Sequence, residues 1–363
     1  MDEILKTHKE LTVNRLPVLT WNHLKVNDSK VILPEKLELA IDSSEIRGLD
    51  DEGISLQEHA KEQKDIATGM GKEALDYVLA NATSSASYTI TENKKIKEPL
   101  VITKKLKADW LDYISILAKK DSEITVILSY ESLKEAKGLH GNAILMDLQD
   151  GAKVRLLVVQ LLNQNYEHFT NIGITCEDHA SVEINYIGIG AKKFWVGCEV
   201  NLLGRESSCK VETSYLGGMD KQMDFNLIAR HIGKKTVSEI KGYGVLAKNS
   251  RKIMRGTIDF IKGAKGAVGS ETENVLMLSK EAENKSVPLI LCAEDDVDGR
   301  HGASIGNINA QQLFYLNSRG ISREEAHKIF AQSLVERMKD SIEDEKVKDR
   351  LGEFGGNYLE QLI

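Results

Sequence analysis

The residues best suited to chemistry gather around one acidic stretch near the end of the strand-rich part of the chain. His301 follows the stretch Glu294–Asp298, which holds four carboxylates, and Cys292 lies just before it. Imidazole and carboxylate groups together suit a borderline divalent metal such as iron. The pattern therefore favours a metal site on His301, with Cys292 and Glu294 as further candidate ligands. A histidine that only hydrogen-bonds to these carboxylates is an equally weighted alternative.

Other short motifs are incomplete. Gly69–Lys72 resembles part of a phosphate loop, but the upstream glycine and the following Ser or Thr are missing. Asp296–Gly299 begins like a calcium loop, yet Asn307 stands where the closing glutamate would be. The four cysteines form no Cys-x-x-Cys pair, and no serine lies in a Gly-x-Ser-x-Gly elbow. The sequence thus predicts no nucleotide, calcium or zinc site and no nucleophilic serine.

The composition is that of a folded protein with a mixed surface. Of 363 residues, 41% are hydrophobic, and the net charge of −7 disfavours a nucleic-acid binder of the usual basic kind. The longest strongly apolar run, Leu156–Leu162, is far shorter than the roughly 20 residues that span a bilayer. The start at Met1 shows no secretory signal, and four cysteines make no disulfide framework. We expect a cytoplasmic protein with reduced thiols, without nucleic-acid or membrane partners.

Short strand-like segments recur at a nearly constant step between residues 142 and 297. Valines at 154, 182, 211 and 237 are 28, 29 and 26 residues apart, each in an alternating segment. Stacked coils of a solenoid repeat in this way because each coil must bury its face against the next. The pattern predicts a mainly β fold, a right-handed parallel β-helix in which these valines form one inward-facing ladder. An antiparallel β-sandwich is the alternative.

The flanks of the repeat are expected to be helical. We predict an N-terminal helical region at 1–84, a β-helix core at 85–305 and a C-terminal helical region at 306–363. The C-terminal region carries a capping box, Ser322–Glu325, that precedes an apolar stripe at helical spacing. The stripe consists of Ala326, Ile329, Phe330, Leu334 and Met338. We expect these helices to cover the open edge of the last coil.

Four segments near the C-terminus together carry a specific resemblance. They are Pro288–Cys292, Asp295–Val297, His301–Gly306 and Gln312–Ile321. This pattern resembles the C-terminal signature of the SufB/SufD family, which assembles iron–sulfur clusters. Arg255-Gly256 and Leu16–Asn22 agree with the family more weakly.

The resemblance implies a non-catalytic scaffold with a β-helix core and helical ends. In this family a SufB-like subunit pairs with a SufD-like subunit through the β-helix. Each also binds SufC, an ABC-type ATPase, through its C-terminal helices, where we expect Arg319 and Arg323 to contact the ATPase. The implied cofactor is iron or an iron–sulfur cluster, held transiently and shared with the partner subunit.

Two positions favour the SufD-like branch. SufB-like chains carry a reactive cysteine where this chain has 282–285, and a second carboxylate where it has Gly302. Gly299 departs from the cysteine typical of SufD-like chains, so ligation must depend on His301. Two alternatives stay open: a self-paired, homodimeric scaffold for iron or clusters, and, from another class, a β-helix carbohydrate enzyme.

Overall fold

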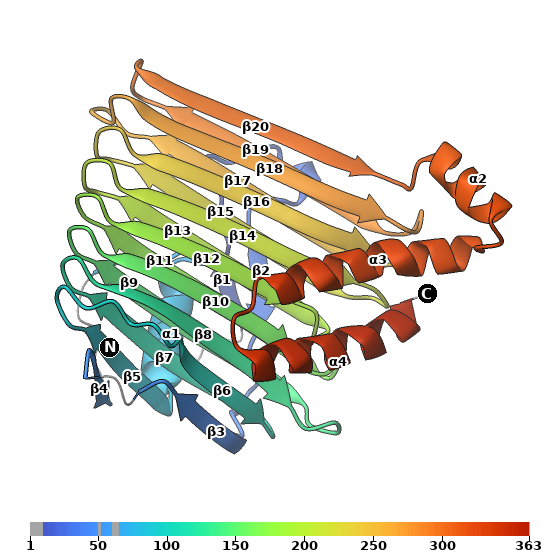
Figure 1. The fold of residues 1–363 in the computed structure, drawn as a ribbon, viewed down its shortest axis with the longest axis horizontal. Helices are drawn as coiled ribbons and strands as arrows, with labels where there is room; N and C mark the ends of the chain where they lie inside the picture. The colour runs from blue at the N-terminus through green and yellow to red at the C-terminus, as the bar shows by residue number, and fades with distance from the viewer. Residues whose placement is uncertain (1–9, 50–51, 60–64, 363) are drawn as a thin grey trace.

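The computed structural model describes residues 10–49, 52–59 and 65–362. Within these ranges, two nine-stranded sheets face one another as the walls of a solenoid (Figure 1). Consecutive strands alternate between the sheets, and neighbours within each sheet run parallel from the second coil onward. The mainly β, parallel solenoid predicted from the repeat is confirmed, with about eight turns in the described part of the chain.

From β5 onward, odd-numbered and even-numbered strands make up separate sheets. The odd sheet contains β5 (Ser84–Ile90), β7 (Trp110–Ala118), β9 (Gly138–Leu148), β11 (Tyr166–Cys176), β13 (Lys193–Leu202), β15 (Gln222–His231), β17 (Arg251–Phe260) and β19 (Glu283–Cys292), with β4 (Ile54–Glu58) beside β5. The even sheet contains β6 (Leu100–Leu106), β8 (Glu123–Ser132), β10 (Lys153–Leu161), β12 (Ser181–Gly188), β14 (Ser208–Gly217), β16 (Val237–Leu246), β18 (Ala267–Met277) and β20 (Val297–Gly306), with β3 (Ile41–Arg47) beside β6.

Alternate residues of each strand point into the solenoid and stack in ladders. One inward ladder runs through Leu100, Val126, Leu156, Ile184, Val211 and Ile240, all buried. Because side chains alternate with a period of two, the residues between them face outward. The main hydrophobic core is therefore the interior of the solenoid, and successive coils add layers of apolar side chains to it.

The predicted valine ladder is correct for its first pair and wrong beyond it. Val154 pairs with Val182, but Val182 then pairs with Cys209, so Val211 lies in a different inward ladder. Val237 lies on the outer face and is 47% exposed. The corner loops differ in length, and a shift of one residue turns a side chain to the opposite face.

Among its described residues, the expected N-terminal helical region contains more strand than helix. It contains β1 (Glu10–Val13), β2 (Ser29–Ile32), a 3-10 turn η1 (Asn22–Leu24), β3, β4 and one helix, α1 (Lys72–Asn81). Residues 1–9 and 60–64 lie outside the described ranges. Strands β3 and β4 pair antiparallel with the first coil, and β3 contains a bulge. They form here because the first coil offers sheet edges that need hydrogen-bond partners.

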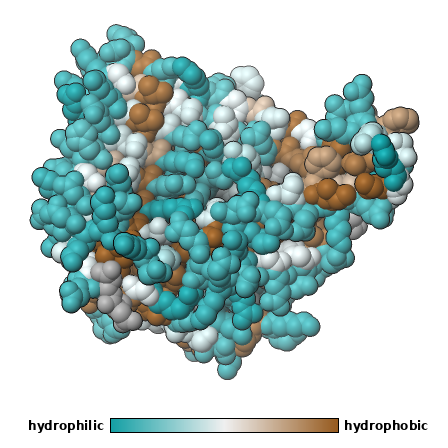
Figure 2. Space-filling view, viewed as in Figure 1, coloured by the Kyte–Doolittle hydropathy of each residue, from teal (hydrophilic) through white to brown (hydrophobic). Residues whose placement is uncertain are grey.

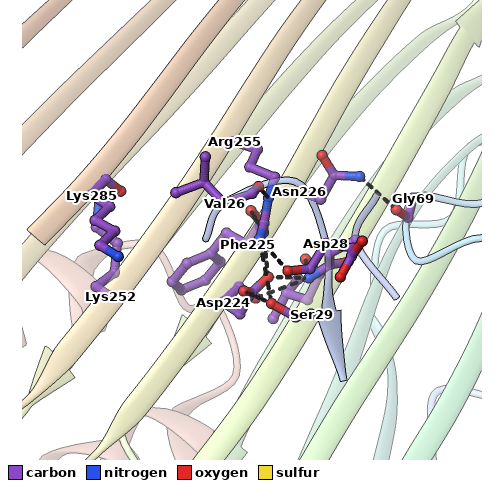
Figure 3. A network of polar contacts seen from close by, with 12 residues as sticks. Val26, Asp28, Ser29, Gly69, Asp224, Phe225, Asn226, Lys252, Arg255 and Lys285 are labelled. Atoms are coloured by element: carbon purple, nitrogen blue, oxygen red, sulfur yellow. Dashed lines mark hydrogen bonds and ion pairs between the residues drawn. The ribbon is translucent and has the colours of Figure 1, made fainter. Parts of the chain in front are cut away.

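The segment 11–33, called the strap, lies on the outer face of the odd sheet and is held by buried polar contacts (Figure 3). Arg255 of β17 is fully buried and binds Asp224 of β15 at 2.6 Å. It also donates to the carbonyl of Val26 at 2.5 Å and to the hydroxyl of Ser29 at 3.3 Å. The arginine therefore joins the strap to two late coils.

Three helices follow the solenoid: α2 (Ala310–Ser318), α3 (Arg323–Asp340) and α4 (Glu345–Leu362). The capping box at Ser322 and Glu325 is present. Helices α3 and α4 pack on the outer face of the even sheet, so the expectation that they cover the last coil is wrong (Figure 1). That face carries apolar residues such as Val159 and Ile187, which need burial. In the predicted stripe, Ile329 is 52% exposed.

Within the described residues, no helix combines the length and the apolar character needed to span a bilayer.

Candidate functional site

The last coil ends in two uncovered sheet edges. Among the described strands, β19 bonds only to β17, and β20 bonds only to β18. No residue of either strand is buried, and residues 299–306 of β20 are all exposed. Long edges of this kind are templates for pairing with another chain. By contrast, the strands at the other end, β3 and β4, are short and antiparallel.

His301 lies on the last rung of an inward-facing ladder at this open end. It pairs in register with Glu271, which pairs with Ile240 of the inward ladder that begins at Leu100. The side chain of His301 therefore shares the interior face of β20, yet it is exposed because no further coil covers it in the described part of the chain. This position makes the imidazole accessible both to a bound ion and to a second chain.

Cys292 and Glu294 lie at the corner before β20, away from His301. The thiol of Cys292 donates to the carbonyl of Glu294 at 3.1 Å. The Glu294 carboxylate accepts from the amide of Gly263 at 2.9 Å, and its hydrogen bonds to backbone amides lower its pKa. His301 is four residues beyond the start of β20, roughly 13 Å along the strand. In the described ranges no group of three His, Cys, Asp or Glu side chains could hold a metal ion.

Two glutamates beneath the open end were missed by the sequence patterns. Glu273 is buried and is satisfied: it forms an ion pair with Lys252, accepts from the hydroxyl of Ser286, and accepts from Tyr215 at 3.1 Å. The signal that could have found this pair is a Glu-x-Glu pattern at inward-facing positions of a repeat that otherwise places apolar residues there.

Glu271, by contrast, has a carboxylate oxygen without a partner. It is 6% exposed, and its Oε2 makes no hydrogen bond to any described group. Burial and the neighbouring Glu273 raise the pKa of Glu271 to about 7. The carboxylate lies against Gly256, where an added Cβ would be 2.1 Å from Oε1. The Arg255-Gly256 pair thus has two roles: the arginine faces the strap, and the glycine leaves room for Glu271.

The predicted partner-binding arginines follow the protruding helix α2: Arg319 is its C-cap, and Arg323 is the first residue of α3. Arg319 and Arg323 are both exposed, and the guanidinium of Arg319 lies 5.3 Å from the ring centre of Tyr315. Phe314 is 76% exposed and Tyr315 is 58% exposed. Figure 2 shows a hydrophobic patch at this end of the molecule. In the sequence these adjacent aromatic residues belong only to the segment that resembles the family, so their exposure was not predicted.

Comparison with known proteins gives one family over most of the chain. Residues 102–334 match the profile described as "SUF system FeS cluster assembly, SufBD core domain". This matched range covers the solenoid from β6 onward and reaches into α3.

Individual relatives are similar over shorter segments. The chain is 32% identical over 151 residues to iron–sulfur cluster assembly protein SufD of Bacillus subtilis, covering 42% of this chain and 35% of that protein. It is 24% identical over 230 residues to SufD of Escherichia coli, covering 63% and 54%. It is 24% identical over 198 residues to SufB of Bacillus subtilis, covering 54% and 43%. The chain thus spans about a third to a half of the length of these relatives.

Proposed function

Because the chain belongs to the SufB/SufD family of the SUF system for iron–sulfur cluster assembly, we propose that it is the SufD-like scaffold subunit of such a complex. In this role it is non-catalytic and acts in the cytoplasm beside a partner ATPase. Support for the SufD-like role comes from the absence of a cysteine at 282–285 and from Gly302 in place of a carboxylate. The family match removes the reason for considering a carbohydrate enzyme.

The uncovered edges β19 and β20 are the observation that carries the pairing proposal. A SufB-like solenoid would add its own edge strands here and satisfy the free backbone groups. The strap supplies additional apolar surface beside this edge. Lys285 of β19 donates to the carbonyl of Leu24 at 3.0 Å, and the nearby Trp21 is 75% exposed. A self-paired homodimer would use the same surface.

Iron or an iron–sulfur cluster is the cargo of this interface. His301 is exposed on the edge strand that would meet the partner, so its imidazole could share the cargo with ligands from the second chain. Cys292 and Glu294 remain candidate ligands from the sequence pattern, although they lie at the distant corner.

The surface around α2 is the proposed dock for a SufC ATPase. Exposed aromatic and arginine side chains are the residue types enriched where proteins bind one another. Phe314, Tyr315, Arg319 and Arg323 combine both types on and beside a helix that protrudes from the solenoid (Figure 1).

A substitution at Gly302 tests the pairing. A Cβ at Gly302 would meet no atom within 4 Å, so Gly302→Lys should leave the isolated chain folded. The lysine would place a charge on the edge strand, and binding of a SufB-like partner should weaken by roughly tenfold or more. The matched control is Gly356→Lys in α4, which is equally unobstructed and lies far from the edge.

Affinity is measured by calorimetric titration with the SufB-like protein, and oligomeric state by light scattering of the chain alone. Equal binding by both lysine variants would contradict pairing through this edge. A homodimer in the wild type that is lost only in Gly302→Lys would favour the self-paired scaffold.

A further inference from the structure

We infer that Glu271 and His301 together form a binding site for a divalent transition-metal ion at the open end of the solenoid. The inference rests on the proposed function only in taking iron as the natural cargo. The two residues are register partners on neighbouring parallel strands, β18 and β20. Register partners in a sheet lie about 4.8 Å apart with side chains on the same face. The carboxylate and the imidazole therefore face the same interior space.

Among the described residues, no cation forms a direct ion pair with Glu271, and Lys252 acts on it only through its charge, without a hydrogen bond. Lys252 is buried in these coils, and its ammonium group binds Glu273. Glu273 is further held by Tyr215 and Ser286, whereas the buried Oε2 of Glu271 has no hydrogen-bond partner among the described residues. A buried, unpaired carboxylate is costly unless a cation or a proton neutralises it. The space beneath His301 thus favours an incoming cation.

The donor set defines which cation fits. One carboxylate oxygen and one imidazole nitrogen suit Fe²⁺, Co²⁺ or Zn²⁺ better than Ca²⁺ or Mg²⁺, which prefer oxygen ligands alone. Glu271 is anchored below by the packed coil, and His301 is exposed above. Two protein ligands leave coordination positions open for water in the isolated chain. The ion can therefore bind before a partner covers the edge, and the partner then completes its coordination.

An ion pair between a protonated His301 and Glu271 is the metal-free alternative. It would also compensate the carboxylate, and it predicts no metal affinity at this end. The two arrangements differ in one measurable respect: only the metal site makes the affinity for a divalent ion depend on both side chains.

The test uses the full chain, purified alone and without oxygen, with Fe²⁺ and Co²⁺ as probes in equilibrium dialysis. Glu271→Gln and His301→Ala should each raise the dissociation constant by roughly tenfold or more. Glu271→Asp keeps the charge and shortens the reach of the carboxylate, and it should also weaken binding. Urea unfolding of each variant verifies the fold.

Two matched controls separate this pair from the other carboxylates of the open end. Asp298→Asn changes a carboxylate that Arg300 already pairs on the same strand, and Glu283→Gln changes a carboxylate of β19 that Arg251 pairs. Both should bind Fe²⁺ and Co²⁺ like the wild type. Wild-type affinity in folded Glu271→Gln, or the absence of any binding that depends on His301, would overturn the inference.

Failure of this inference and failure of the scaffold role are distinguishable. If the variants lose the metal but still bind the SufB-like partner and the ATPase, both proposals are supported. If metal binding never depends on Glu271 while the complex still forms, the proposed metal site of Glu271 and His301 is wrong and the scaffold role stands. If the isolated chain binds the metal through both residues but forms no complex, the scaffold role is wrong.

Discussion

Gly256 is the residue whose small size has the clearest structural reason. Its missing side chain leaves the space that the Glu271 carboxylate occupies, since an added Cβ would lie 2.1 Å from Oε1. Gly256→Ala should therefore displace Glu271 or strain β17, and we expect a loss of about 1–3 kcal/mol in the free energy of unfolding. Urea denaturation of the variant and the wild type measures this loss. Gly302→Ala, at a position with no atom within 4 Å, is the control and should change stability by less than about 0.5 kcal/mol.

A buried histidine pair makes stability depend on pH. His140 and His168 are fully buried in the early coils, and their Nδ1 atoms lie 2.8 Å apart. Burial lowers the pKa of both below the ordinary value of 6.5. Nearby Asp112 has its own pKa lowered, because Lys104 and His140 outweigh the effect of burial.

The sign of the pH effect follows from these lowered histidine values. The unfolded chain binds protons at His140 and His168 below about pH 6.5, whereas the folded chain resists binding them. Their contribution to stability is therefore complete above about pH 6.5 and is lost as the pH falls toward the lowered pKa. The urea midpoint should drop between pH 7.5 and 5.5, and a His140→Gln, His168→Gln double variant should lose less over that interval. Exposed His179→Gln should behave like the wild type.

At the residue scale, the sequence pattern proposed His301 for the candidate site and did not propose Glu271. The acidic context of His301 is visible in the linear chain, and the structure places this residue at the open end. Glu271 could not be found in the same way, because it meets His301 only through the stacking of successive coils. Cys292 and Glu294, which are close in sequence, are instead separated from His301 by the direction of β20.

At the scale of a strand, register decides what a substitution costs. Val182 is 3% exposed inside the solenoid, whereas Val237 is 47% exposed on its outer face. Val182→Asp would bury an unpaired charge and should cost about 4 kcal/mol or more. Val237→Asp should stay within about 0.5 kcal/mol of the wild type. Urea denaturation of the two variants compares them directly, and equal losses would contradict the register.

The periodicity predicted the type of strand and its parallel neighbours but not the register beyond one coil. Step length alone cannot show whether an extra residue lies in a corner or in a strand, and Val237 was misplaced for this reason. Strands β3 and β4 were missed because their pairing partners, β6 and β5, follow later in the chain. Strand β3, for example, is polar and takes its conformation from β6.

Helix α2 is the element whose exposed face supports a specific binding prediction. Reversing both charges in an Arg319→Glu, Arg323→Glu variant should weaken binding of a SufC ATPase by roughly tenfold or more, since interface arginines contribute strongly to affinity. Phe314→Ala, at a side chain 76% exposed, should weaken it without changing charge. Calorimetric titration with the ATPase measures both variants. Arg350→Glu on α4 is the control, and unchanged affinity in all three would place the dock elsewhere.

At the scale of the whole molecule, the strap connects parts of the chain that are far apart in sequence. The bond from Arg255 to Val26 joins residues 229 positions apart (Figure 3), and the amide of Asn14 donates to the carboxylate of Asp224, 210 positions away. A solenoid is otherwise held only by contacts between successive coils. The strap adds longer-range contacts along one wall, which no local sequence pattern could indicate.

The two ends of the solenoid differ in their ability to accept further strands, and this difference limits how many chains can join. Strands β3 and β4 are short and reversed, and β3 is bulged, so that end is a poor acceptor of further strands. Among the described strands, β19 and β20 form the end suited to pairing, which would make each chain monofunctional in the language of polymer chemistry. Under the proposed pairing, joining two such ends would use both of them and stop further addition. The product would be a rod of fixed length, two solenoids long.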